Sequence, residues 1–219
     1  RLVVRRLRCF LKNFFKDKFK MKYEEAIAFI ASRWNDELVV TSAGTSSELW
    51  YAETGDTERV FYLEASMSLS SVFACGIAQG VPDVPVWVFS GDGAFCMNPG
   101  MLQVERQMDL PNLKHFMVSN RAYGSTSNVP LPGRIDNNYP AIAHGFGLQR
   151  VYSFASMNEL TGKFDEAVME PGHTFIHLEV DPMDYRGASP PMDGPEVKFR
   201  FGRHVEKLSG KDVFSAPLD

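Results

Sequence analysis

Residues 84–127 constrain the fold more than any other stretch of the chain, because two strand-like runs flank a helix-length segment there. The runs at 86–90 (VWVFS) and 113–119 (LKHFMVS) are near-continuous and apolar, and a helix is predicted between them over about 99–108. This order predicts a βαβ unit with parallel strands. Because the carboxyl ends of parallel strands share one edge of a sheet, we expect Asp92 and Asn120 to lie close together there.

These two side chains suit a hard divalent cation that carries a phosphate group. A carboxylate and an amide oxygen are suitable ligands for such an ion, and the glycines of the Gly91-Asp92-Gly93 turn expose backbone N–H groups beside them. Taken singly, Asp92 is also typical of a turn or a helix N-cap, and Asn120 of a turn at the end of a strand. The pair favours the metal–phosphate interpretation.

Composition excludes several classes of protein. The chain has 219 residues, of which 44% are hydrophobic and 23% charged, as is typical of a globular protein, and it has no apolar run long enough for a membrane span. The cysteines Cys9, Cys75 and Cys96 form no CxxC pair, which predicts a reduced, cytoplasmic setting with Cys75 and Cys96 buried. Residues 1–20 carry eight basic residues and one acidic, a charge of +7, which leaves −11 of the total −4 for the rest. An acidic body argues against nucleic acid as the main partner.

The remaining segments extend the same alternation. Further strands are predicted at 37–41, 60–63, 150–153 and 174–180, and further helices at 23–34, from about 46, and at 70–80, 139–148 and 156–169. This order predicts an α/β fold, a doubly wound and mostly parallel sheet of about six strands with helices on both faces. The segment 128–140 is predicted to be a long ordered loop, whose Arg134 either binds an acidic substrate or is simply solvated.

The Gly91-Asp92-Gly93 turn, followed after a helix and a strand by Asn120, resembles the diphosphate and metal signature of thiamine diphosphate (ThDP) dependent enzymes. The flanking sequences, YLEASMSLSSVFACGIAQG before and NRAYGSTS after, are similar to the cofactor domain of the phosphonopyruvate and sulfopyruvate decarboxylases, in particular to the beta-type subunit. The similarity covers roughly residues 21–181. The triplet alone is a weak signal, since such turns occur wherever a strand meets a helix, but the ordered series is specific.

The resemblance implies a set of cofactor contacts. Asp92, the side chain of Asn120 and the backbone carbonyl of Ala122 would bind Mg²⁺, and Met67 would support the bend between the two rings of ThDP. The backbone carbonyl of Ala65 would accept a hydrogen bond from the aminopyrimidine. The full set of cofactor-binding residues implied is Thr41, Ser42, Ala65, Ser66, Met67, Gly91, Asp92, Gly93, Ala94, Asn120, Ala122, Tyr123, Gly124 and Ser125. For the turn at residues 41–45, an ordinary strand-to-helix turn is an equal alternative from the residues alone.

The activity that the resemblance implies is decarboxylation of a 2-oxo acid to an aldehyde and CO₂. The catalytic glutamate would come from a pyrimidine-binding partner subunit, so that no catalytic residue lies in this chain and a hetero-oligomer, a dimer of heterodimers or larger, is expected. The sequence departs from the family in one place, since Ser47 replaces a basic residue before Glu48-Leu49 and puts phosphonate or sulfonate substrates in doubt. The alternatives are the ThDP subunit of a 2-oxo acid oxidoreductase or a carboligase, and a non-catalytic regulatory subunit.

Three regions are expected along the chain. Residues 1–20 form a basic extension, either a membrane-surface or targeting helix or, as we favour, translated upstream sequence before a start at Met21. Residues 21–182 form the ThDP domain. Residues 183–219, rich in proline, glycine and charge, are expected to form an extended arm over a partner, with a partly disordered tail as the alternative.

Overall fold

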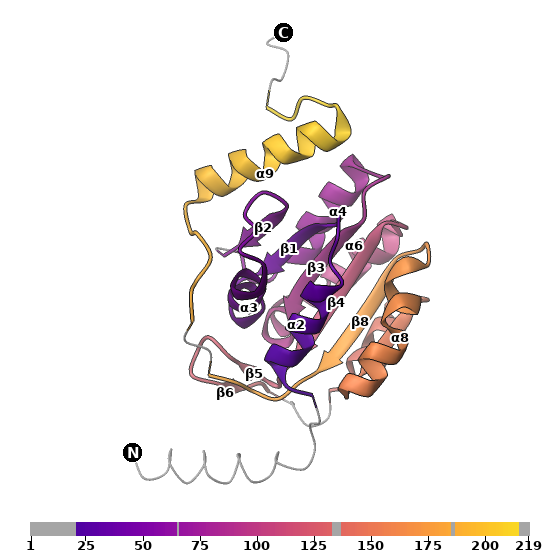
Figure 1. Cartoon of the computed structure of the whole chain (residues 1–219). Helices are drawn as coiled ribbons and strands as arrows, with labels where there is room; N and C mark the ends of the chain where they lie inside the picture. The colour runs from indigo at the N-terminus through magenta and orange to yellow at the C-terminus, as the bar shows by residue number, and fades with distance from the viewer. Residues whose placement is uncertain (1–20, 65, 133–136, 185–186, 215–219) are drawn as a thin grey trace.

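A computed structural model describes residues 21–64, 66–132, 137–184 and 187–214. Its centre is a six-stranded sheet in the order β2-β1-β3-β4-β8-β7, in which every neighbouring pair is parallel (Figure 1). The strands of this sheet are β1 (Leu38–Ser42), β2 (Val60–Leu63), β3 (Val86–Gly91), β4 (Leu113–Ser119), β7 (Val151–Phe154) and β8 (Thr174–Glu179). A separate antiparallel pair joins β5 (Ala122–Tyr123) to β6 (Val129–Pro130). The predicted α/β fold with a parallel sheet is confirmed.

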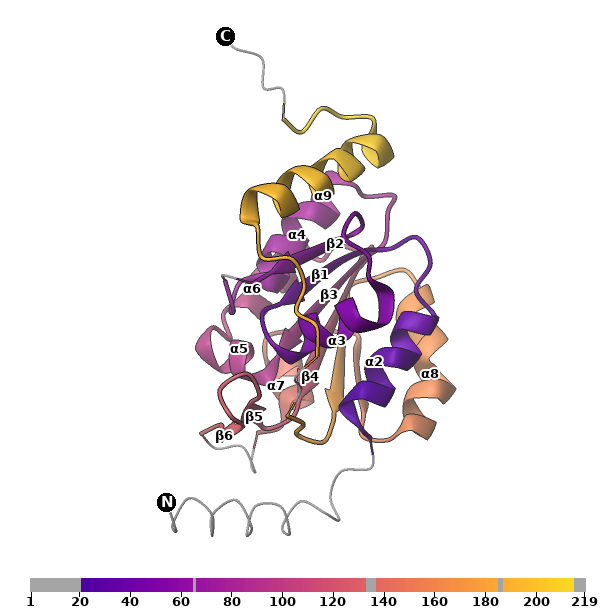
Figure 2. The same ribbon diagram turned by 60° about the vertical axis from the view of Figure 1, so that its left-hand side comes forward.

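Helices cover both faces of the sheet, because its central strands are apolar on both sides. One face packs against α2 (Tyr23–Ser32), α3 (Thr45–Thr54) and α8 (Met157–Met169), in a cluster that includes Trp50, Trp87 and Phe164. The other face is covered by α4 (Ser70–Gly80), α5 (Asp92–Met97), α6 (Met101–Met108) and α7 (Tyr139–Gly145). Figure 2 shows this layered arrangement from the side. Every residue of β4 is buried, as expected of a strand with helices on both faces.

The strand order places a topological switch point between β1 and β3. The chain moves from β1 outward to β2, then returns through α4 to β3 on the opposite side of β1. At such a point the connections leave the sheet in opposite directions, which opens a crevice at the carboxyl ends of the two strands. A ligand site at this crevice would therefore include the turns that follow β1 and β3.

Two segments differ from the sequence-based expectation. The region after residue 182 contains α9 (Gly194–Ser209), which lies over β2 and α4 in both views, where an extended arm was expected (Figures 1 and 2). A further helix, α5, begins directly at Asp92, ahead of the helix predicted from about residue 99.

Cys96, expected to be buried, is exposed on α5, whereas Cys75 is buried as expected. Among the described residues, no helix is both long and apolar enough to cross a bilayer. Residues 1–20, Ala65 and Arg134 lie outside the described residues.

Candidate functional site

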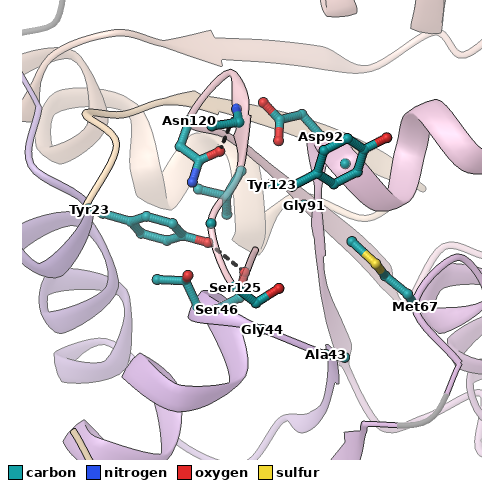
Figure 3. A pocket seen from close by; sticks show the side chains of 15 residues that line it. Tyr23, Ala43, Gly44, Ser46, Met67, Gly91, Asp92, Asn120, Tyr123 and Ser125 are labelled. Carbon is teal, nitrogen blue, oxygen red and sulfur yellow. Dashed lines mark hydrogen bonds between the residues drawn. The ribbon is translucent and has the colours of Figure 1, made fainter. Parts of the chain in front are cut away.

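A pocket opens at the switch point, at the carboxyl edge of the sheet (Figure 3). It is formed by the turn between β1 and α3, the junction of β3 with α5, and the loop that follows β4. Its lining residues are Tyr23, Ala43, Gly44, Thr45, Ser46, Met67, Gly91, Asp92, Gly93, Val118, Asn120, Ala122, Tyr123, Gly124 and Ser125. Asp92 and Asn120 therefore share one pocket, as the parallel βαβ geometry requires.

Asp92 is a buried carboxyl group of this pocket. Its side chain is 1% exposed, and Oδ2 accepts hydrogen bonds from the backbone N–H of Arg121 at 2.6 Å and from Ser119 Oγ at 3.0 Å. Burial raises the pKa of Asp92 to about 7, although the hydrogen bonds from Arg121, Ser119 and Gly93 favour the ionised form. Near neutral pH the ionised carboxylate is therefore poorly stabilised by the protein alone, and a bound cation would supply the missing charge.

Asn120 is held beside it by a local turn. The side-chain Oδ1 of Asn120 accepts a hydrogen bond from the backbone N–H of Ala122 at 3.0 Å, and Asn120 is 5% exposed. A carbonyl oxygen has two lone pairs, so this contact orients the amide and leaves one lone pair for a cation. Both candidate side-chain ligands are thus oxygen atoms on rigid strand ends, a donor set that suits Mg²⁺.

The turn between β1 and α3 faces the same pocket with backbone groups. Gly44, at φ 104°, is the N-cap of α3, and among the described residues no side chain caps this helix. The first N–H groups of α3 consequently remain available to an anion, which the helix dipole also favours. Ser46, in the first turn, lies 2.6 Å from the hydroxyl of Tyr23, which comes from α2 (Figure 3).

Gly93 and Gly124 allow two close approaches of the loop that follows β4. A Cβ atom at Gly93 would lie 2.7 Å from the ring of Tyr123 and 3.3 Å from the methyl group of Met67. A Cβ atom at Gly124 would lie 2.8 Å from Thr45 Oγ1. The Tyr123 ring thus covers Gly93, and the cavity that remains has a volume of about 40 Å³. That space suits an ion or a water molecule.

The structure gathers most of the sequence-predicted site. The predicted residues that line the pocket are Met67, Gly91, Asp92, Gly93, Asn120, Ala122, Tyr123, Gly124 and Ser125. Thr41, Ser42, Ser66 and Ala94 lie outside the lining, and Ser42 Oγ instead donates to the backbone carbonyl of Met67 at 2.8 Å. Ala65 is outside the described residues.

Sequence reasoning missed three residues of the lining, Tyr23, Ser46 and Val118. It considered the turn at residues 41–45 but named Thr41 and Ser42 as the cofactor contacts, whereas Ala43, Gly44 and Thr45 line the pocket. The predicted strand ended at Thr41, whereas β1 continues to Ser42, so the residues that face the pocket come later in the turn than the two that were named. Tyr23 comes from a different helix, and only tertiary packing brings its hydroxyl to Ser46. Ser47, the residue at the position of the family's basic side chain, is buried and donates a short hydrogen bond to Glu64.

The fold and the pocket define a class, namely doubly wound α/β proteins with a polar pocket at the switch point of a parallel sheet. Residues 45–178 match the family described as thiamine pyrophosphate enzyme, C-terminal TPP binding domain. The chain belongs to this family, which confirms the resemblance seen in the Gly91-Asp92-Gly93 turn and its flanking sequences.

Known proteins similar to the chain point in the same direction. It is 31% identical to the sulfopyruvate decarboxylase subunit beta of Methanocaldococcus jannaschii, over 78% of this chain and 89% of that protein. It is 30% identical to a sulfopyruvate decarboxylase of Methanosarcina acetivorans, over 83% of this chain but 46% of that protein. The crystal structure of benzoylformate decarboxylase from Polynucleobacter necessarius superposes with a TM-score of 0.62 and 15% identity, over 78% of this chain and 34% of that one. This last likeness concerns the fold alone.

Proposed function

We propose that this chain is the diphosphate-binding subunit of a heteromeric ThDP-dependent 2-oxo acid decarboxylase. The observation that carries the proposal is the meeting of Asp92 and Asn120 in one pocket at the switch point of the sheet. The similarity to a decarboxylase subunit named beta, over most of the length of both proteins, supports the assignment to a subunit. We propose a cytoplasmic complex with a chain that supplies the activating glutamate.

The residues present fit Mg²⁺ and a diphosphate. In the proposed arrangement the Asp92 carboxylate, the Asn120 amide oxygen and the Ala122 carbonyl hold the metal. The N–H groups at the start of α3 and of residues 93 and 94 face the diphosphate, and Met67 supports the bend of the cofactor. ThDP, when bound, supplies the nucleophilic carbon and the electron sink that decarboxylation of a 2-oxo acid requires. The chain itself binds and orients the cofactor.

The substrate class is proposed as 2-oxo acids without a second strongly acidic group. The hydroxyl of Ser47 donates a hydrogen bond to Glu64, and burial raises the pKa values of both Glu64 and its neighbour Glu48. Ser47 and these two carboxyl groups thus offer no positive charge at the position where the resembled family carries a basic side chain, which supports a substrate without a phosphonate or sulfonate group.

The proposal is tested by reconstitution with a candidate partner chain. We expect the isolated chain to bind Mg²⁺ and ThDP weakly and to release no CO₂ from pyruvate, longer 2-oxo acids or sulfopyruvate. The complex should bind Mg²⁺ and ThDP, with a clear rise in its melting temperature, and it should release CO₂. Decarboxylation by the isolated chain would overturn the two-subunit site, and a complex whose melting temperature ignores Mg²⁺ and ThDP would overturn the cofactor assignment.

A further inference from the structure

Arg121 links the proposed metal ligand to the rest of the sheet edge. It follows Asn120 directly and adopts a left-handed backbone conformation, with φ 60°. This conformation turns its backbone N–H toward Asp92 Oδ2, at 2.6 Å. A non-glycine residue in this region is strained by about 1 kcal/mol or more, and it persists only where its surroundings hold it.

The contacts of the Arg121 side chain hold this backbone conformation in place. Its Nε donates to Glu179 Oε1 at 2.9 Å and its Nη2 to Glu179 Oε2 at 2.6 Å, in a two-pronged ion pair. Its Nη1 donates to the backbone carbonyl of Asn137 at 2.8 Å, and the guanidinium lies 5.0 Å from the ring centre of Tyr139. The side chains of Arg121 and Glu179 are 12% and 16% exposed, so solvent screens the pair only weakly.

Glu179 is fixed independently of the pocket. It is the last residue of β8, where it pairs in register with Ser119 at the end of β4. His177, two residues earlier on the same strand, approaches the Glu179 carboxylate at 3.4 Å and is itself 2.8 Å from Ser153 Oγ on β7. Three adjacent strand ends thus meet at Arg121, which follows β4: its backbone N–H binds Asp92 after β3, and its side chain binds Glu179 on β8.

We propose that Glu179 is a positioning residue for the metal site. By holding the guanidinium of Arg121, it fixes the left-handed turn that aims the Arg121 N–H at Asp92 and keeps Asn120 and Ala122 at the edge. Groups that orient a ligand in this way commonly change metal affinity by 10- to 100-fold when they are removed. This inference rests on the proposed function for its metal-binding part.

The first test needs no cofactor. In the free chain, Glu179→Gln removes the charge but keeps the length of the side chain, and we expect the Arg121 amide hydrogen to exchange with solvent about tenfold faster. Glu170→Gln is the matched control, because Glu170 also pairs with an arginine, Arg150 at 2.9 Å, at the opposite edge of the sheet. An Arg121 amide that exchanges at the wild-type rate in Glu179→Gln overturns the proposal.

The second test follows metal binding in the reconstituted complex. At saturating ThDP, the Mg²⁺ concentration that gives half of the thermal stabilisation should rise about tenfold in Glu179→Gln and stay unchanged in Glu170→Gln. In the Arg121→Gly background, where no guanidinium remains, adding Glu179→Gln should change that concentration by less than about twofold. An equal effect in both backgrounds, or an unchanged Mg²⁺ requirement, overturns the positioning role.

A third variant covers a failure of Glu179→Gln to fold. Arg121→Lys keeps the charge but lacks the planar, two-pronged geometry, so it should also raise the Mg²⁺ requirement. If the wild-type complex does not respond to Mg²⁺ and ThDP, the proposed function fails, and the exchange rate of the Arg121 amide alone then decides the role of Glu179.

Discussion

Asp92 illustrates at the residue scale how a buried carboxylate lowers the stability of the metal-free chain. Its folded pKa, raised by burial to about 7, lies above the ordinary value of 3.8. A group with a raised folded pKa contributes stability below its unfolded pKa and loses it as pH rises through the folded value. Between pH 4 and 7 the ionisation of Asp92 should therefore lower the free energy of unfolding by a few kcal/mol in the metal-free chain.

Asp92→Asn should remove this penalty and the metal site together. At pH 8 we expect the metal-free variant to be more stable than the wild type by roughly 1–3 kcal/mol, with a smaller difference at pH 5. Urea unfolding at both pH values measures this, and added Mg²⁺ and ThDP should no longer stabilise the complex. The control is Asp165→Asn on an exposed side chain, for which little change is expected. A variant less stable than the wild type at pH 8 contradicts the assignment of Asp92 as an uncompensated buried charge.

At the scale of elements, α9 is a helix that follows a segment whose composition is typical of an extended arm. The prolines and glycines of residues 183–195 suggested an extended arm, yet Asp193 caps the helix through a bond from the Glu196 N–H at 3.1 Å. Val197, Phe201 and Val205 recur at intervals of four residues on its inner face. The cap followed by this apolar stripe is the signal that predicts a helix, and the composition of the preceding segment obscured it.

Phe201 should anchor α9 to the sheet. It is 4% exposed and packs 5.4 Å from Phe61 on β2, between ring centres. We expect Phe201→Ala to lower the free energy of unfolding by about 3 kcal/mol, through lost burial and the cavity left behind. Phe199→Ala is the matched control, because Phe199 lies on the same helix but is 49% exposed. Equal and small effects of the two substitutions in chemical denaturation would contradict the anchoring of α9 and would favour the extended arm predicted from composition.

A buried ionic cluster connects layers at the scale of the whole molecule. Glu105 on α6 is 1% exposed, and its Oε2 lies 3.1 Å from His115 Nδ1 on β4 and 2.9 Å from His173 Nε2 before β8. His115 also reaches Ser90 Oγ on β3, at 2.6 Å. The two imidazoles outweigh the effect of burial and lower the pKa of Glu105 to about 2. The cluster thus joins α6 to β3, to β4 and to the residue that precedes β8.

The cluster should set the acid limit of the fold. Because the folded pKa of Glu105 lies below its ordinary value of 4.5, its contribution is present above pH 4.5 and is lost as pH falls through 2. Glu105→Gln should cost about 3 kcal/mol at pH 7 and flatten the loss of stability below pH 4.5. Thermal unfolding between pH 2 and 7 measures both effects, with the exposed Glu25→Gln as control. An acid limb as steep in Glu105→Gln as in the wild type would assign acid unfolding to other groups.

Local sequence was sufficient for most elements of the sheet. The bounds of β2, β4 and α4 coincide with those predicted, because buried parallel strands are continuous apolar runs and a small-residue helix stands out between them. The βαβ rule also predicted that Asp92 and Asn120 meet, since handedness and parallel pairing leave one edge for both. The exposure of Cys96 was missed because only the first four residues of α5 are buried, whereas its last two, Cys96 and Met97, are exposed.

The sequence by itself determined the parallel α/β sheet, the family and the pair of side chains at its edge, because each depends on short-range pattern and chain order. The tertiary structure alone decided that Tyr23 reaches Ser46, that the Tyr123 ring covers Gly93, and that Glu179 holds Arg121 beside Asp92. These contacts join residues from different strands and helices, and their geometry depends on how whole elements pack. Periodicity along one chain carries no information about that packing distance, so such contacts become visible only in the folded molecule.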